Sequence, residues 1–212
     1  KLIYKKYFHI GIAMDTPHGL MVPKIRDADK KDITELGKEL TASLQEGAVI
    51  VGVLKGCLPF MADLVRELDL PIEVDFLALS SFMPDTGRVR LTRDLDTDIT
   101  GKQVVLVEDL VDTGLRLNFL LQHLRGRSPS EVRVCAMFDR VERRVIPVEL
   151  QHVGFELDSS YVVGYGLDHG GKFRNLPELV SLELGELERN SQEVCDQVYA
   201  LGREHRLLSG NI

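Results

Sequence analysis

The sequence predicts an α/β protein whose mostly parallel sheet is covered by helices on both faces. Short apolar runs of strand type alternate along the chain with segments of helical apolar spacing. The run 104–107 is unbroken and aliphatic, which is typical of a strand buried on both faces. It stops at two adjacent carboxylates, and a helix-like segment follows at 115–124. Open α/β sheets bind ligands at this edge, so the turn between these segments is the first candidate site.

Length, composition and charge limit the class of protein. The chain has 212 residues, of which 44% are hydrophobic and 28% charged, enough for one sizeable core and a small subdomain. The net charge of −7 argues against non-specific nucleic-acid or membrane-surface partners. We see no apolar run of about 18 residues and no signal-peptide centre. We expect a cytoplasmic protein whose cysteines (Cys57, Cys135 and Cys195) are reduced and buried.

The first part of the chain predicts two short strands and a helix. The strands are expected at 7–13 and 20–22, with a turn between them and a charged loop at 24–32. Asp32 and Glu35 then form a capping-box pattern before a helix that ends at Gly47. The apolar face of this helix comprises Ile33, Leu36, Leu40 and Leu44.

The central part predicts two strand-helix units and a hairpin. Strands are expected at 48–54 and 73–79, with a helix between them whose apolar stripe lies within 60–68. Asp75 is an unusual acid for the interior of the second strand. The polar, turn-rich segment 80–102 predicts a hairpin or mobile flap.

The remaining chain predicts short strands and a closing helix. The strands are expected at 132–138, 153–155 and 161–163. A helix is expected over 191–206, and its inward residues would be Val194, Val198 and Leu201.

Three carboxylates surround the turn that follows the strand at 104–107. Glu108 and Asp109 can accept two hydrogen bonds from a vicinal diol such as a ribose. Asp112 can serve as a base, and the amides around Thr113 and Gly114 can form an anion nest. The alternative is that the acids only cap the following helix, and composition leaves both interpretations open.

Five segments resemble the hypoxanthine-guanine phosphoribosyltransferases, in the same order and spacing. Segment 107–114 is similar to Val-Glu-Asp-x-x-Asp-Thr/Ser-Gly, the binding loop for phosphoribosyl pyrophosphate in type I phosphoribosyltransferases. The segments 53–56 and 74–81 resemble the pyrophosphate loop and the strand before the flexible loop. The segments 161–168 and 173–176 resemble the base-binding segment and the one after it.

The resemblance implies a fold, a domain organisation and an activity. The fold would be that of type I phosphoribosyltransferases, with a hood subdomain. The domain would span 33–190, after an atypical segment 1–32 (part of the hood or fused sequence) and before a C-terminal helix and tail at 191–212. The activity would be purine salvage, which makes IMP or GMP from hypoxanthine or guanine and phosphoribosyl pyrophosphate with Mg²⁺. The family also implies a homodimer or homotetramer.

The resemblance also implies a role for each matching residue. Glu108 and Asp109 would hold the ribose hydroxyls, and Asp112 would act on purine N7 as general base or acid. Mg²⁺ would be held by Glu108, Asp109 and Asp168, directly or through water. The residues implied in substrate binding are Lys55, Gly56, Glu108, Asp109, Leu110, Val111, Thr113, Gly114, Leu115, Arg116, Arg140, Tyr161, Val162, Asp168 and Arg174. Among them, Lys55 and Gly56, through a cis peptide, would bind pyrophosphate with Arg174, while Tyr161 would stack on the purine.

Four departures from the family pattern bear on activity. Arg116 stands where the family has a threonine that meets the phosphate, and Phe82 replaces a tyrosine of the flexible loop. That loop is several residues shorter before Arg88, and Arg140 replaces the lysine that reads the purine 6-oxo group. These departures support an alternative: a catalytically impaired paralogue that binds nucleotide or phosphoribosyl pyrophosphate and acts as a regulatory or assembly protein.

The N-terminal segment shows a different resemblance. Residues 7–32 are similar to a fragment of the catalytic domain of 2-oxo-acid dehydrogenase acyltransferases, and 17–21 faintly resemble vertebrate purine phosphoribosyltransferases. The His-x-x-x-Asp-Gly motif of acyl transfer is absent from the sequence, so no acyltransferase activity is expected. The histidines expected to be structural or on the surface are His18, His123, His152 and His169.

Overall fold

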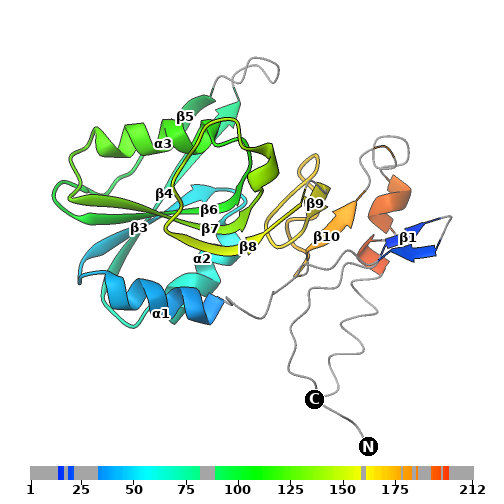
Figure 1. Cartoon of the computed structure of the whole chain (residues 1–212), viewed down its shortest axis with the longest axis horizontal. Helices are drawn as coiled ribbons and strands as arrows, with labels where there is room; N and C mark the ends of the chain where they lie inside the picture. The colour runs from blue at the N-terminus through cyan, green and yellow to red at the C-terminus, as the bar shows by residue number, and fades with distance from the viewer. Residues whose placement is uncertain are drawn as a thin grey trace, which may run out of the picture. The chain divides into compact units, whose positions relative to one another are not determined.

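Figure 1 shows the computed structural model of the chain, which forms two compact units. One unit is Asp27–Ser159, and the other combines Lys1–Arg26 with Ser160–Ile212. The structure describes residues 14–16, 19–21, 33–81, 89–158, 161–177, 179–182, 185, 192–196 and 198–200. The segment boundaries expected after residues 32 and 190 stay a prediction.

The larger unit is built on a six-stranded sheet with the order β5-β4-β3-β6-β7-β8. All neighbouring strands are parallel except β4 and β5. The strands are β3 Ala48–Leu54, β4 Ile72–Ser81, β5 Val89–Arg93, β6 Gln103–Val111, β7 Glu131–Asp139 and β8 His152–Glu156. This confirms the predicted strands. The antiparallel pairing of β4 with β5 agrees with a hairpin, one of the two interpretations of segment 80–102. Phe82 and the expected short loop lie outside the described residues.

Helices cover both faces of this sheet, as predicted. The helix α3 lies on one face, and α1 and α2 lie on the other (Figure 1). The α-helices are α1 Ile33–Ser43, α2 Leu58–Leu64 and α3 Leu115–Arg125, and the 3₁₀ turns are η1 Val65–Glu67 and η2 Val141–Arg143. Asp32, the expected cap of α1, lies outside the described residues.

The core explains why the strands read as continuous apolar runs. Val49, Val51 and Val53 of β3 pack in one cluster with Leu106 of β6 and Leu120 of α3. The residues between them, such as Ile50, are equally buried because the other face of the sheet is covered too. The burial of apolar side chains on both faces is the main stabilising contribution to this unit.

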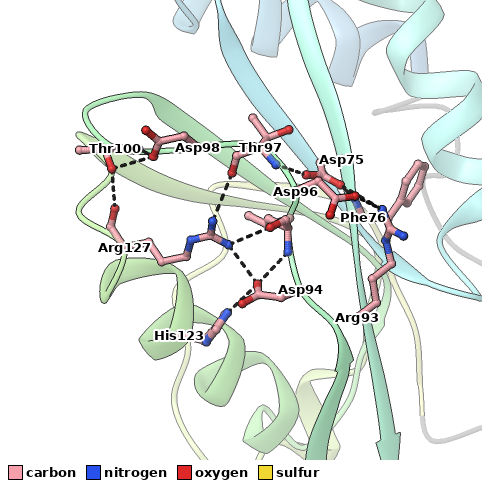
Figure 2. A network of polar contacts seen from close by, with 11 residues as sticks. Asp75, Phe76, Arg93, Asp94, Asp96, Thr97, Asp98, Thr100, His123 and Arg127 are labelled. Carbon is pink, nitrogen blue, oxygen red and sulfur yellow. Dashed lines mark hydrogen bonds and ion pairs between the residues drawn. The ribbon is translucent and has the colours of Figure 1, made fainter.

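Asp75, the acid inside β4, is buried because it holds a loop in place. Its Oδ2 accepts a hydrogen bond of 2.8 Å from the amide of Thr97, and its Oδ1 accepts one of 2.7 Å from the amide of Phe76 (Figure 2). Only 6% of the residue is exposed, and the two amides satisfy its carboxylate. Asp75 therefore fastens the segment that leads from β5 to β6.

A second polar cluster fastens the same segment to α3. Asp94 Oδ1 lies 2.9 Å from His123 Nε2 and 3.1 Å from Arg127 Nη1 (Figure 2). The predicted structural role of His123 is thus confirmed. His152 likewise has a structural partner, since its Nδ1 lies 3.1 Å from Glu39 Oε2.

The smaller unit contains two antiparallel strand pairs. The strand β1 (Met14–Thr16) pairs with β2 (Gly19–Met21), and β9 (Tyr161–Val163) pairs with β10 (Val180–Leu182). The expected strand at 20–22 is present one residue earlier. Neither β1 nor β10 was predicted, and β1 includes residues that were expected in the turn. The expected strand at 7–13 and the residues beyond 200 of the expected helix lie outside the described residues.

A small core in this unit joins the C-terminal helical residues to the strands. Residues 192–196 and 198–200 are helical, and Cys195 and Val198 pack with Val163 and Phe173. None of Cys57, Cys135 and Cys195 is in a disulfide and all three are buried, which confirms the expectation for the thiols. Within the described part of the chain, no helix is long and apolar enough to cross a membrane.

Candidate active site

Two loops meet at the carboxyl edge of the sheet. The strands β3 and β6 are parallel neighbours, and Gly52 pairs with Val107. Their following segments, 55–57 and 112–114, therefore emerge at the same edge. Burial raises the pKa of the Cys57 thiol in the first loop to about 12. The negative charges of Asp109 and Glu108 contribute to this increase, so they lie near the thiol. The two loops are thus close enough to form one site.

The first loop contains an unusual peptide bond. The bond between Leu54 and Lys55 is cis, although the second residue is not proline. Lys55 is exposed, Gly56 is buried, and the amide of Leu58 donates to the Lys55 carbonyl at 3.3 Å. The cis peptide implied by the family resemblance is present at the predicted lysine.

Glu108 and Asp109 share one cation. The Nη2 of Arg116 lies 2.9 Å from Glu108 Oε2 and 3.5 Å from Asp109 Oδ1. Glu108 is 1% exposed, and its burial raises its pKa to about 7 although Arg116 lowers it. In turn, the charge of Glu108 raises the pKa of Arg116. The two carboxylates predicted to bind ribose therefore form one ion-paired cluster with Arg116, the residue that differs from the family pattern.

The turn between β6 and α3 leads into a helix N-terminus. Gly114 is the N-cap of α3 with φ of 83°, in the left-handed region that favours glycine. A Cβ at this position would lie 2.5 Å from the carbonyl oxygen of Ile146. Thr113 Oγ1 accepts a hydrogen bond of 3.4 Å from the amide of Leu115. Since the N-cap is Gly114, none of the three acids is the capping residue, and the N-terminus is suited to bind an anion.

Asp112 faces two arginines from the segment that follows β7. Its Oδ1 lies 3.3 Å from Arg143 Nε, and its Oδ2 lies 3.9 Å from Arg140 Nη1. The Arg140 amide donates to the Val111 carbonyl at 2.9 Å, which fixes the start of this segment. The structure thus brings predicted Asp112 and Arg140 together. Arg143 was missed, and the only signal for it was the basic sequence around Arg140.

The same segment is fastened to the site turn by backbone hydrogen bonds. The amides of Val145 and Ile146 donate to the Thr113 carbonyl at 2.9 and 3.0 Å. Arg144 forms an ion pair with Asp139 at the end of β7. These contacts hold the two arginines beside Asp112.

The predicted base-binding residues lie in the smaller unit. The hydroxyl of Tyr161 lies 2.9 Å from His169 Nδ1, and the two rings meet edge to face. Val162 is buried in β9 and pairs with Ser181 of β10. His169 is therefore a structural partner of the tyrosine that the family resemblance makes the stacking residue.

Asp168 and Arg174 form a second predicted pair within this unit. Arg174 Nη2 lies 2.6 Å from Asp168 Oδ1, and Arg174 Nη1 donates to the Gly166 carbonyl at 2.7 Å. The other oxygen of Asp168 accepts a hydrogen bond of 2.8 Å from the Gly171 amide. These contacts close the loop between the base-binding segment and the one after it.

The carboxylates implied for Mg²⁺ are of the right chemical type but are engaged by arginines. Carboxylate oxygens are the donors that Mg²⁺ prefers, so the donor set fits the ion. The carboxylates of Glu108 and Asp109 contact Arg116, and that of Asp168 contacts Arg174. Among the described residues, no group of three or more His, Cys, Asp and Glu side chains could hold a metal.

More than half of the chain is similar to a known family of transferases. Residues 24–169 match the family model of the phosphoribosyl transferase domain. The chain is 40% identical over 152 residues to the hypoxanthine-guanine phosphoribosyltransferase of Bacillus subtilis, covering 70% of this chain and 84% of the relative. It is 41% identical over 161 residues to the hypoxanthine phosphoribosyltransferase of Haemophilus influenzae, covering 73% and 90%. The chain belongs to the hypoxanthine-guanine phosphoribosyltransferase family.

Solved structures confirm the predicted fold. A hypoxanthine-guanine phosphoribosyltransferase from Bacillus anthracis is 37% identical with a TM-score of 0.69, covering 74% of this chain and 93% of that one. A hypoxanthine phosphoribosyltransferase from Staphylococcus aureus is 35% identical with a TM-score of 0.68, covering 71% and 84%. The acyltransferase resemblance of residues 7–32 stays a prediction, and most of that segment lies outside the described residues.

Proposed function

We propose that this protein transfers the 5-phosphoribosyl group from phosphoribosyl pyrophosphate to hypoxanthine or guanine, giving IMP or GMP and pyrophosphate. The observation that carries the proposal is the turn of β6 and α3. It presents Glu108, Asp109 and Asp112 before a glycine-capped helix N-terminus, beside the loop of Lys55. Diol acceptors, a base and an anion site are thus combined on one edge of a parallel sheet.

The phosphoribosyl group is held by three kinds of contact in this proposal. Glu108 and Asp109 accept hydrogen bonds from the ribose hydroxyls once Arg116 has left them. Backbone amides from Thr113 onward surround the 5′-phosphate at the N-terminus of α3. The family resemblance assigns the pyrophosphate to Lys55, Gly56 and Arg174.

Bond cleavage then relies on charge stabilisation. As the bond to pyrophosphate breaks, positive charge develops at the ribose and negative charge on the leaving group. Lys55 and Arg174 are the cations that the family resemblance assigns to the leaving group. Mg²⁺, for which the resemblance implies Glu108, Asp109 and Asp168, would supply further charge neutralisation. Asp112 takes or returns the proton at purine N7.

The family resemblance assigns three residues to recognition of the purine. Tyr161 stacks on the ring, Val162 offers its backbone to the ring edge, and Arg140 binds the 6-oxo group. The physiological setting that we infer is purine salvage in the cytoplasm, by a homodimer or homotetramer.

The proposal is tested by following nucleotide formation from each base with phosphoribosyl pyrophosphate and Mg²⁺. We expect IMP or GMP with the native protein and little product with an Asp112→Asn variant. The matched control is Asp63→Asn. Asp63 lies in α2 and forms an ion pair with Arg66 of the 3₁₀ turn that follows. If the native protein turned over no faster than the Asp112→Asn variant, the proposal would be rejected. Nucleotide binding without turnover would favour the non-catalytic regulatory or assembly protein.

A further inference from the structure

Arg116 contacts the carboxylates that the proposed function assigns to the ribose. It lies on the first turn of α3, and its guanidinium is within 3.5 Å of both Glu108 and Asp109. The Glu108 side chain is 1% exposed, whereas the Arg116 side chain is 47% exposed. The arginine therefore covers the buried acid from the solvent side.

A buried carboxylate strongly favours such a partner. An ionised acid that leaves water without a counter-charge is costly, and hydrogen-bonded pairing offsets that cost. Arg116 supplies charge and an N–H donor to Glu108, and its charge also reaches Asp109. The free protein thus carries its own cation at this pair.

A ribose diol and a divalent cation would need the same oxygen lone pairs. Hydroxyls donate to carboxylates as guanidinium N–H groups do, and Mg²⁺ binds carboxylate oxygens directly. Arg116 Nη2, 2.9 Å from Glu108 Oε2, takes up one acceptor position of that oxygen, and its positive charge opposes the approach of a divalent cation. The Arg116 side chain is already half exposed, so it can move fully into water. An incoming diol or cation can then replace it as the partner of Glu108.

We propose that Arg116 is the resident cation of the free site, and that ribose or a divalent cation engages Glu108 and Asp109 only by displacing it. This deepens the proposed function and rests on it. The consequence is specific: the free native protein does not bind Mg²⁺ at this pair, whereas a protein without the arginine does.

Thermal unfolding in EDTA and in MgCl₂, without base or phosphoribosyl pyrophosphate, tests the exchange. Native protein should unfold within about 1 °C in both solutions, whereas Arg116→Thr should gain about 3 °C or more with Mg²⁺. The gain should vanish when Glu108→Gln is added. Arg125→Thr, at the other end of α3, is the matched control and should resemble the native protein. Because no turnover is measured, this result is separate from that of the activity assay.

Two results would overturn the proposal. One is that Mg²⁺ stabilises the native protein and that Asp109→Asn abolishes this effect. Glu108 and Asp109 would then be able to bind Mg²⁺ in the free protein while Arg116 is present. The other is an Arg116→Thr variant with no larger response to Mg²⁺ than the native protein. If Arg116→Thr does not fold, Arg116→Lys decides. Its single ammonium group cannot pair with both acids as a guanidinium does, so a partial response supports the exchange and no response rejects it.

Discussion

The Nε of Arg143 lies 3.3 Å from Oδ1 of Asp112, and Arg140 approaches the other oxygen of the same carboxylate. The two arginines begin and end a short segment that returns to the site after β7. The carboxylate at the proposed proton-transfer position therefore carries positive charge on two sides. The two arginines therefore hold the Asp112 carboxylate in position beside the turn between β6 and α3.

Replacing Asp112 by asparagine should lower kcat while leaving the binding of phosphoribosyl pyrophosphate nearly unchanged. Asparagine keeps the shape of the side chain but cannot act as a base, and general acid-base catalysis contributes about 10²-fold or more. Steady-state kinetics with hypoxanthine, together with calorimetric titration of phosphoribosyl pyrophosphate, would separate the two effects. A variant with native kcat would show that the proton moves by another route.

Removing Arg116 should destabilise the protein through the acid it leaves behind. Arg116→Met should lower the free energy of unfolding by about 2 kcal/mol, because Glu108 would lose its charged partner inside the protein. Glu108→Gln should cost less, and the double variant should show a coupling of about 1 kcal/mol. Urea unfolding of the four proteins in EDTA measures the cycle. Additive effects would show that the pair contributes no stability.

Gly114→Ala should disrupt the site turn more than an equivalent change elsewhere. The added Cβ would meet the Ile146 carbonyl at 2.5 Å, in a backbone conformation that alanine rarely adopts. We expect a loss of about 2 kcal/mol or more in the free energy of unfolding and weaker binding of phosphoribosyl pyrophosphate. Gly47→Ala is the control, since Gly47 has φ of 80° but nothing within 4 Å of the added Cβ. Equal losses for the two variants would show that the contact with Ile146 is unimportant.

Cys57 should resist alkylation and should make the protein less stable in alkali. Burial and the charges of Asp109 and Glu108 raise its pKa to about 12, against about 8.5 for an unfolded thiol. The folded state therefore favours the neutral thiol. Its contribution to stability is complete below about pH 8.5 and falls as the pH rises toward 12, by up to about 1.4 kcal/mol per pH unit.

Two measurements check the behaviour of this thiol. Alkylation at pH 8 followed by peptide mass spectrometry should leave Cys57 unmodified in the native protein and modified in urea. Urea unfolding between pH 8 and pH 10.5 should show a smaller loss of stability for Cys57→Ala than for the native chain. The same pH dependence in both proteins would contradict the raised pKa.

Much of the fold was predictable because local patterns dictate it. The alternation of apolar strands with amphipathic helices follows from burial of both sheet faces, and the strand Ala48–Leu54 was predicted with its observed bounds. β10 was missed because its three residues, Val180–Leu182, include a buried serine and show no strand pattern of their own. Only its pairing with β9 makes that segment a strand.

The sequence by itself determined the fold class and the acid-rich turn, because strand, carboxylates, glycine and helix are contiguous between Gln103 and Arg125. Tertiary structure decided which charges meet. Arg143 reaches Asp112 because backbone hydrogen bonds hold the segment after β7 against Thr113. Arg116 turns back to Glu108 because a buried carboxylate needs a cation, and burial is a property of the assembled sheet and helices.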